Sequence, residues 1–223
     1  MNQMSRIPSF KDAQAFVVNR QGSEEVVRQS LYDFQEYPTG GFTSMKFFQV
    51  PSGQSGKTDQ DTNMTLAGQL PQPLFHLTQS IEVLLFPGVD PVTGNTTPAA
   101  TQFANDVYNI MKAGSLKLRI GSKDYLEEAP LMRFPPKSRM DVQGAVSLFR
   151  VEPVPQEDQA AAVENISLDY GVAGGRPYFL DPPILLQPTQ NFDIELNFAT
   201  AVPIATAARI GIVLDGLLYR LSQ

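Results

Sequence analysis

The stretch GQSGKT, residues 53–58, comes closer to a chemical motif than any other part of the sequence. It follows an apolar run, MKFFQV, and it ends in Gly-Lys-Thr like a phosphate-binding P-loop. A P-loop also needs a glycine five residues before Gly56, and this chain has Pro51 there. Because proline has no backbone N–H, this position cannot donate a hydrogen bond to a phosphate as the glycine of a P-loop does.

A P-loop must also open a helix, whose N-terminal amides help to bind the phosphate. The sequence behind Thr58, DQDTNMTLAGQLPQP, has no helical periodicity, and no β-α-β pattern surrounds it. We therefore interpret the stretch as part of a hydrophilic loop and not as a nucleotide site. In this interpretation Lys57 and Asp59 are free to pair with a neighbouring molecule.

The same loop contains a partial calcium-binding pattern. Asp59, Asp61 and Asn63 alternate as in the first half of an EF-hand loop. The sixth position should be glycine and is Met64, and the twelfth should be glutamate and is Leu70. The three oxygen-bearing side chains are thus weak metal candidates, and solvated loop residues are the alternative.

Other residues that could perform catalysis lack the arrangement it needs. His76 is the only histidine, it lies in a strand-like stretch, and the chain has no G-x-S-x-G elbow. Asp193 and Glu195 alternate with apolar residues, which is typical of the polar face of a half-buried strand. Glu127 and Glu128 are adjacent and would point to opposite faces of a hairpin. We expect a structural histidine, no catalytic residue, no cofactor and no enzymatic activity.

Composition excludes several further classes of function. The net charge of −6 disfavours a protein that binds nucleic acid non-specifically, because phosphate contacts need clustered Lys and Arg. Cysteine is absent, so thiolate catalysis and Cys-based metal sites are excluded. The N-terminus has no apolar core like that of a signal peptide, and no apolar run approaches the ~20 residues of a membrane span. The sequence therefore predicts a soluble protein made without Sec export.

The scaffold that holds these residues is predicted to be all-β. Eighteen prolines and 16 glycines divide the chain into short runs with strand character, about eight to ten in number. One segment differs: Thr97 is a plausible N-cap, Pro98 suits a first helical position and Gly114 a position just past the end. We predict one inserted helix near 98–113. The runs with strand character are 15–18, 41–50, 75–86, 115–120 with a hairpin at Gly121-Ser122, 141–151, 164–172, 191–200 and 208–221 with a hairpin at Asp215-Gly216.

The domain organisation predicted from these runs is simple. We expect an extended N-terminal arm at 1–14 and one domain at 15–223, with long loops at 51–73 and 130–137. The arm has mixed polarity and no evident partner within the chain, so it either orders against a neighbouring molecule or frays.

Two stretches resemble a known family in their layout. They are residues 45–88, a strand, a long polar loop and a second strand, and residues 182–223, beginning PPILLQPTQNFDIELNF and ending RIGIVLDGLLYRLSQ. The layout is similar to that of single jelly-roll capsid proteins of icosahedral, tail-less bacteriophages. The resemblance implies a jelly-roll fold and a structural virion protein that assembles with copies of itself and with other virion proteins. It carries over no catalytic residue and implies no sequence-specific nucleic acid.

Two other roles remain open at the level of sequence. The chain could be a penton, spike or decoration subunit of the virion. It could also be a β-sandwich module that binds carbohydrate or a cell surface, although it has no tryptophan and Phe outnumbers Tyr by 14 to 7.

Overall fold

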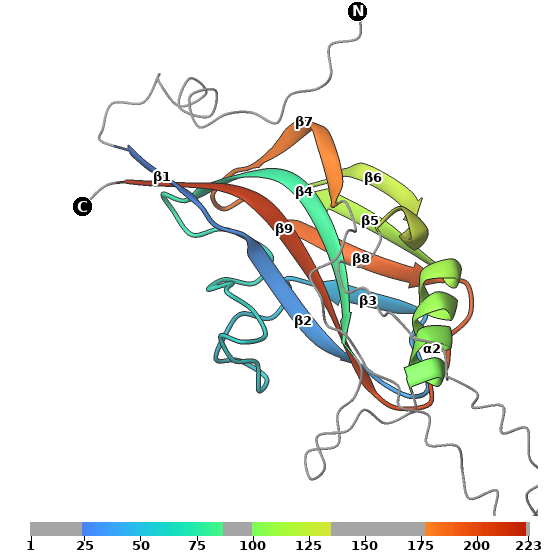
Figure 1. Ribbon diagram of the computed structural model, residues 1–223. Helices are drawn as coiled ribbons and strands as arrows, with labels where there is room; N and C mark the ends of the chain where they lie inside the picture. Colours follow the sequence, from blue (N-terminus) through green and yellow to red (C-terminus); the bar gives the residue numbers. More distant parts are fainter. Residues whose placement is uncertain (1–23, 87–99, 135–176, 222–223) are drawn as a thin grey trace, which may run out of the picture.

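The computed structural model describes residues 24–86, 100–134 and 177–221 (Figure 1). Within these residues the chain is all-β with one helix, as predicted. The predicted arm at 1–14 and the predicted strands at 15–18, 141–151 and 164–172 lie outside them. The elements are β1 (Glu24–Arg28), β2 (Leu31–Tyr37), β3 (Ser44–Phe47), β4 (Phe75–Phe86), α2 (Ala100–Ala113), β5 (Gly114–Ile120), β6 (Lys123–Pro130), the short 3-10 helix η1 (Leu131–Arg133), β7 (Tyr178–Leu186), β8 (Phe192–Phe198) and β9 (Ala208–Leu221).

The strands form two antiparallel sheets that face each other. The five-stranded sheet has the order β1-β9-β4-β7. Strand β2 also pairs with β9, along residues 208–214, whereas β1 pairs with residues 217–221. The four-stranded sheet has the order β3-β8-β5-β6. Figure 1 shows β4, β9 and β2 in one layer and β3, β8, β5 and β6 in the other.

Alternating side chains explain why the two layers close on one core. In β8, Phe192, Ile194, Leu196 and Phe198 are buried, while the residues between them are half-buried. Leu116, Leu118 and Ile120 repeat this pattern in β5. A strand with one apolar face must bury it against another element, and here Ile81 and Val83 of β4 and Ile212 of β9 belong to the same core cluster.

The inserted helix is confirmed: α2 occupies Ala100–Ala113, and residues 98 and 99 of the predicted range lie outside the described part. Ile110 and Met111 are buried, and α2 packs at one end of the sandwich against β5, β6 and η1 (Figure 1). Asp106 on this helix is buried, and it accepts a hydrogen bond of 3.1 Å from the backbone N–H of Ala205. The helix is thereby tied to the loop that precedes β9.

The hairpin predicted at Asp215-Gly216 is wrong, because β9 runs through it without a break. Asp215 pairs with Ser80, and Gly216 pairs with Thr78 of the neighbouring strand β4. A Cβ atom at Gly216 would lie 2.0 Å from the carbonyl oxygen of Leu77. The glycine is required by a close approach of two backbones and not by a turn.

The remaining loop and hairpin predictions have mixed outcomes. The hairpin at Gly121-Ser122 joins β5 to β6, with Gly121 at a φ of +60°. The polar stretch 51–73 is the connection between β3 and β4, as predicted. The predicted loop at 130–137 instead begins inside regular structure, since β6 ends at Pro130 and η1 follows directly; its residues from 135 onward lie outside the described part.

Candidate functional site

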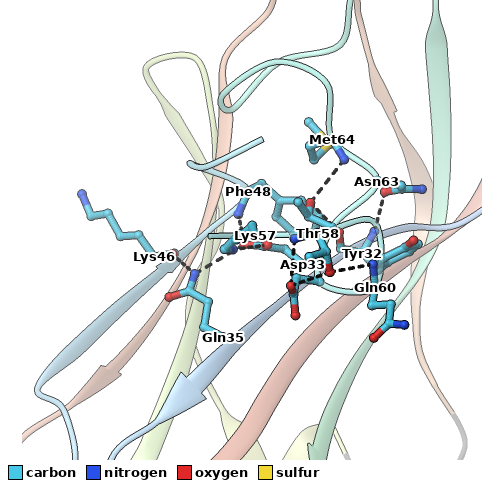
Figure 2. Close-up of polar contacts among 12 residues, drawn as sticks. Tyr32, Asp33, Gln35, Lys46, Phe48, Lys57, Thr58, Gln60, Asn63 and Met64 are labelled. Atoms are coloured by element: carbon cyan, nitrogen blue, oxygen red, sulfur yellow. Dashed lines mark hydrogen bonds and ion pairs between the residues drawn. The ribbon is translucent and has the colours of Figure 1, made fainter. Parts of the chain in front are cut away.

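The chemistry-bearing loop at 51–73 is anchored to β2 by a buried aspartate that sequence analysis missed. Asp33 lies on the same face of β2 as the core residues Leu31 and Tyr37, and it is fully buried. Its carboxylate forms an ion pair with the amine of Lys57, whose side chain is only 14% exposed (Figure 2). The interpretation of Lys57 as a free surface cation is therefore wrong, because the lysine is directed inward.

The second oxygen of Asp33 is held by the protein as well. Its Oδ2 accepts a hydrogen bond of 2.7 Å from the backbone N–H of Phe48 and a longer one of 3.4 Å from Gln35 Nε2. Figure 2 shows the carboxylate at the centre of contacts from β2, from the end of β3 and from the loop. A buried carboxylate in this position joins three segments that are distant in sequence.

The backbone of the loop completes the arrangement by pairing with the free edge of β2. Asp33 and Thr62 form an isolated antiparallel bridge, and Phe34 donates a backbone hydrogen bond of 2.7 Å to Asp61. The side chain of Asn63 takes the place of one further backbone acceptor in this pairing, because its Oδ1 accepts a hydrogen bond of 3.0 Å from the Tyr32 N–H. An exposed strand edge invites pairing with other chains, and this loop covers it.

The three weak calcium candidates lie in this loop, and a protein donor contacts at least one side-chain oxygen of each. Asp61 Oδ2 accepts from the backbone N–H and the hydroxyl of Thr58, both at 2.9 Å, and its Oδ1 pairs with Arg209 at 2.6 Å. These contacts, led by the Thr58 N–H, hold the pKa of Asp61 below its ordinary value. Asp59 accepts from the hydroxyl of Ser52. In the described part of the chain, no three His, Asp or Glu side chains are grouped so that they could hold a metal ion.

The resemblance to a P-loop does not extend to the geometry. Gly53 and Gly56 adopt φ values of +81° and +79°, and the N–H of Gly53 donates to the carbonyl of Lys57 at 2.9 Å. Successive tight turns therefore use the amides that would cradle a phosphate, and the residues after Thr58 form turns and not a helix.

His76 is fully buried in β4, the environment expected of a structural histidine. Nδ1 lies 2.9 Å from the hydroxyl of Thr78, and Nε2 lies 2.9 Å from the carbonyl oxygen of Gln29. Burial lowers the pKa of His76 to about 4, against smaller opposing effects of the Gln29 carbonyl and of Asp215. The ring is neutral near pH 7 and joins the start of β4 to the β1–β2 connection.

The structure describes the side-chain positions of three of the four carboxylates that were considered and set aside as acid and base. Asp193 and Glu195 lie on one face of β8, opposite Arg119 and Lys117 of β5 in the strand register. Glu127 lies on β6 and is exposed. These carboxylates belong to the outer, charged face of the four-stranded sheet.

Among the described residues, a cleft and a groove could each receive a ligand or partner. A polar cleft of about 290 Å³ lies where β5, β8 and the long loop meet, and its lining includes Gln49, Arg119, Asn191 and Asp193. A larger groove of about 560 Å³ runs along the edge strands β6 and β7. The exposed rings of Tyr125 and Phe179 line this edge groove.

No helix in the described part of the chain is long and apolar enough to cross a membrane.

Comparisons with known proteins give the chain no relative. No family model matches it, and no curated protein and no solved structure is significantly similar to it.

Proposed function

We propose that this chain is a jelly-roll structural protein, a self-assembling capsid subunit of an icosahedral bacteriophage. The observation that carries the proposal is the nesting of four antiparallel pairs: β2 with β9, β3 with β8, β4 with β7 and β5 with β6. Such nesting arises when one long hairpin, with its tip at the β5–β6 turn, is wound into two facing sheets. Double-sheet jelly rolls of eight strands are used by viral capsid proteins, and also by lectins and cupins.

The buried polar groups support a structural role over an enzymatic one. Asp33 and Lys57 satisfy each other, and both ring nitrogens of His76 have partners inside the protein. The groups that act in an active site usually line a cleft that substrate can enter. Neither the polar cleft nor the edge groove is lined by any of these three residues.

The edge groove supports assembly. Tyr and Phe are enriched at protein interfaces, because they bury a large area at a small cost in side-chain entropy. Tyr125 is 50% exposed and Phe179 is 48% exposed, and Met132, in the η1 turn that follows β6, is 54% exposed. In the proposed virion these side chains contact a second copy of the chain or another virion protein.

Size-exclusion chromatography with light scattering, followed by negative-stain microscopy, tests the proposal. We expect capsomers, rings or shells from the purified full chain. The position of the subunit in those particles would separate a main shell protein from a penton, spike or decoration subunit. A monomer at every concentration and ionic strength would refute the proposal.

A carbohydrate-binding module is the second candidate, and the polar cleft favours it. Two amide side chains, Gln49 and Asn191, line the cleft together with one cation, Arg119, and one anion, Asp193. Arg119 also forms an ion pair with Asp124 at 2.9 Å. Such a lining suits a neutral, hydroxyl-rich ligand, and a volume near 290 Å³ is at the lower limit of ligand pockets. Binding to a glycan array that is lost in Asn191→Ala, by a chain that stays monomeric, would favour this function.

A further inference from the structure

Asp33 and Lys57 place a carboxyl group against an amine in a site that excludes most water. Asp33 is fully buried, and the side chain of Lys57 is 14% exposed. The two residues are 24 positions apart, one on β2 and the other in the long loop. Their carboxyl and amine groups face each other directly (Figure 2).

We propose that Asp33 and Lys57 condense to form an intramolecular isopeptide bond. This modification is independent of the proposed function, because it concerns only the covalent structure of the subunit. It would fix the long loop to β2 permanently, whichever partner the protein has.

The contacts around the carboxyl group assign a role to each oxygen. Oδ1 faces the amine of Lys57, and Oδ2 accepts from the backbone N–H of Phe48 at 2.7 Å and from Gln35 at 3.4 Å. Donors aimed at one carboxyl oxygen stabilise the negative charge that develops there when a nucleophile adds to the carbon. Oδ2 is therefore the oxyanion and Oδ1 the leaving oxygen.

The step balances without a cofactor or a further reactant. The ammonium of Lys57 first passes one proton to Oδ1 of Asp33, which gives a neutral amine and a neutral acid. The nitrogen lone pair adds to the carboxyl carbon and forms the C–N bond. A second proton moves from nitrogen to Oδ1, the C–O bond breaks, and one water molecule leaves. The product is a neutral secondary amide.

Burial favours this product over the ion pair. Keeping two opposite charges out of water carries a desolvation penalty that their attraction does not always offset, whereas an amide has no charge to desolvate. The fold also holds the reacting groups in contact, and well-oriented intramolecular reactions reach effective concentrations of about 10⁵ M or more. The equilibrium between the ion pair and the amide plus one water molecule is therefore shifted toward the amide.

Mass spectrometry of the intact, folded, full-length protein tests the proposal. We expect a mass lower by one water molecule than the sequence requires. Trypsin should then leave Lys57 uncut and release a branched product, residues 29–46 joined to residues 47–112, because no other Lys or Arg lies between Lys46 and Lys112. A full sequence mass that persists after long incubation of the folded protein at neutral pH would overturn the proposal.

Two lysine variants distinguish the isopeptide from other losses of water, such as cyclisation of an aspartate on its own backbone. Lys57→Arg retains the charge but cannot condense in this way, so its mass should be the full sequence mass. Lys46→Arg changes an exposed lysine of neighbouring β3 and should still lose one water. Loss of water in Lys57→Arg, or a branch point mapped to other residues, would refute the assignment.

Discussion

The ring of Phe34 lies directly over Gly211 of the neighbouring strand β9. A Cβ atom added at Gly211 would stand 2.1 Å from two carbons of the ring, closer than real Cβ contacts allow. Arg209 covers the ring with its guanidinium carbon 4.6 Å from the ring centre, and it also pairs with Asp61 of the long loop at 2.6 Å. The glycine therefore makes room for an aromatic ring through which β2, β9 and the loop are connected.

Gly211→Ala should destabilise the protein by about 1–3 kcal/mol, since overpacking forces either the ring or the backbone to move. The free energy of unfolding from urea titrations measures this change. Gly40→Ala is the matched control: no atom lies within 4 Å of its Cβ position, and the cost should stay within about 0.5 kcal/mol. Equal effects of the two substitutions would show that Phe34 does not restrict Gly211.

The stability of the protein should fall between about pH 6.5 and pH 4 because of His76. Burial lowers the pKa of this ring from 6.5 to about 4 in the folded protein, so the unfolded chain binds a proton that the folded chain excludes. The folded state is fully favoured above pH 6.5 and loses up to about 3 kcal/mol as pH falls to about 4. Carboxylates with a lowered pKa, such as Asp215, also reduce the stability when they are protonated, but only at pH values below about 4.

Urea titrations at several pH values measure this slope. Because His76 is the only histidine, its imidazole protons can also be followed by NMR without ambiguity. His76→Gln should flatten the dependence of stability on pH above pH 4. A midpoint near 6.5 for the ring in the folded protein would contradict the prediction.

Asn63→Ala should cost about 1–3 kcal/mol, because it leaves two backbone groups of the β1–β2 segment without their partners. The Asn63 amide accepts from the N–H of Tyr32 at 3.0 Å and donates to the carbonyl of Ser30 at 2.8 Å. Thermal and urea unfolding measure the loss. Asn197→Ala, on β8 and outside this arrangement, should have a smaller effect.

Calcium should leave the melting temperature of the wild-type chain unchanged. A ligand that binds only the folded state raises it, and the oxygens of Asp61 and Asn63 already accept hydrogen bonds from protein donors. A rise with calcium that magnesium does not reproduce, and that Asp61→Asn abolishes, would restore the loop as a metal site.

Strands with an uninterrupted run of strand-forming residues could be predicted from sequence, and an edge strand interrupted by prolines could not. The predicted run at 75–86 matches β4 residue for residue, and β8 shows the expected burial of Ile194 and Leu196. The segment YFLDPPILL, which forms β7, contains two prolines and bulges between Phe179 and Ile184 opposite β4. Proline is tolerated there because β7 is an edge strand, a position that only the assembled sheet defines.

The centre of the candidate site was missed for a related reason. Strand β2 carries Asp33 on its buried face, so its pattern of apolar residues is interrupted where the site lies. Leu31 and Tyr37 on one side and Tyr32 and Phe34 on the other indicate a strand, which is the signal that could have found it. Lys57 reaches Asp33 because the long loop folds back along the edge of β2. No local sequence pattern predicts the path of that loop.

Replacing Tyr125 and Phe179 together by serine should abolish assembly of the folded subunit. Both rings are about half exposed at the edge groove, so their removal should cost little folding stability but much contact area with a partner. Light scattering should then show monomers where the wild type forms larger particles. Leu66→Ser, at an exposed apolar residue of the long loop, is the control and should assemble normally. If the double variant assembles like the wild type, the subunits meet through another surface and the edge groove has no part in assembly.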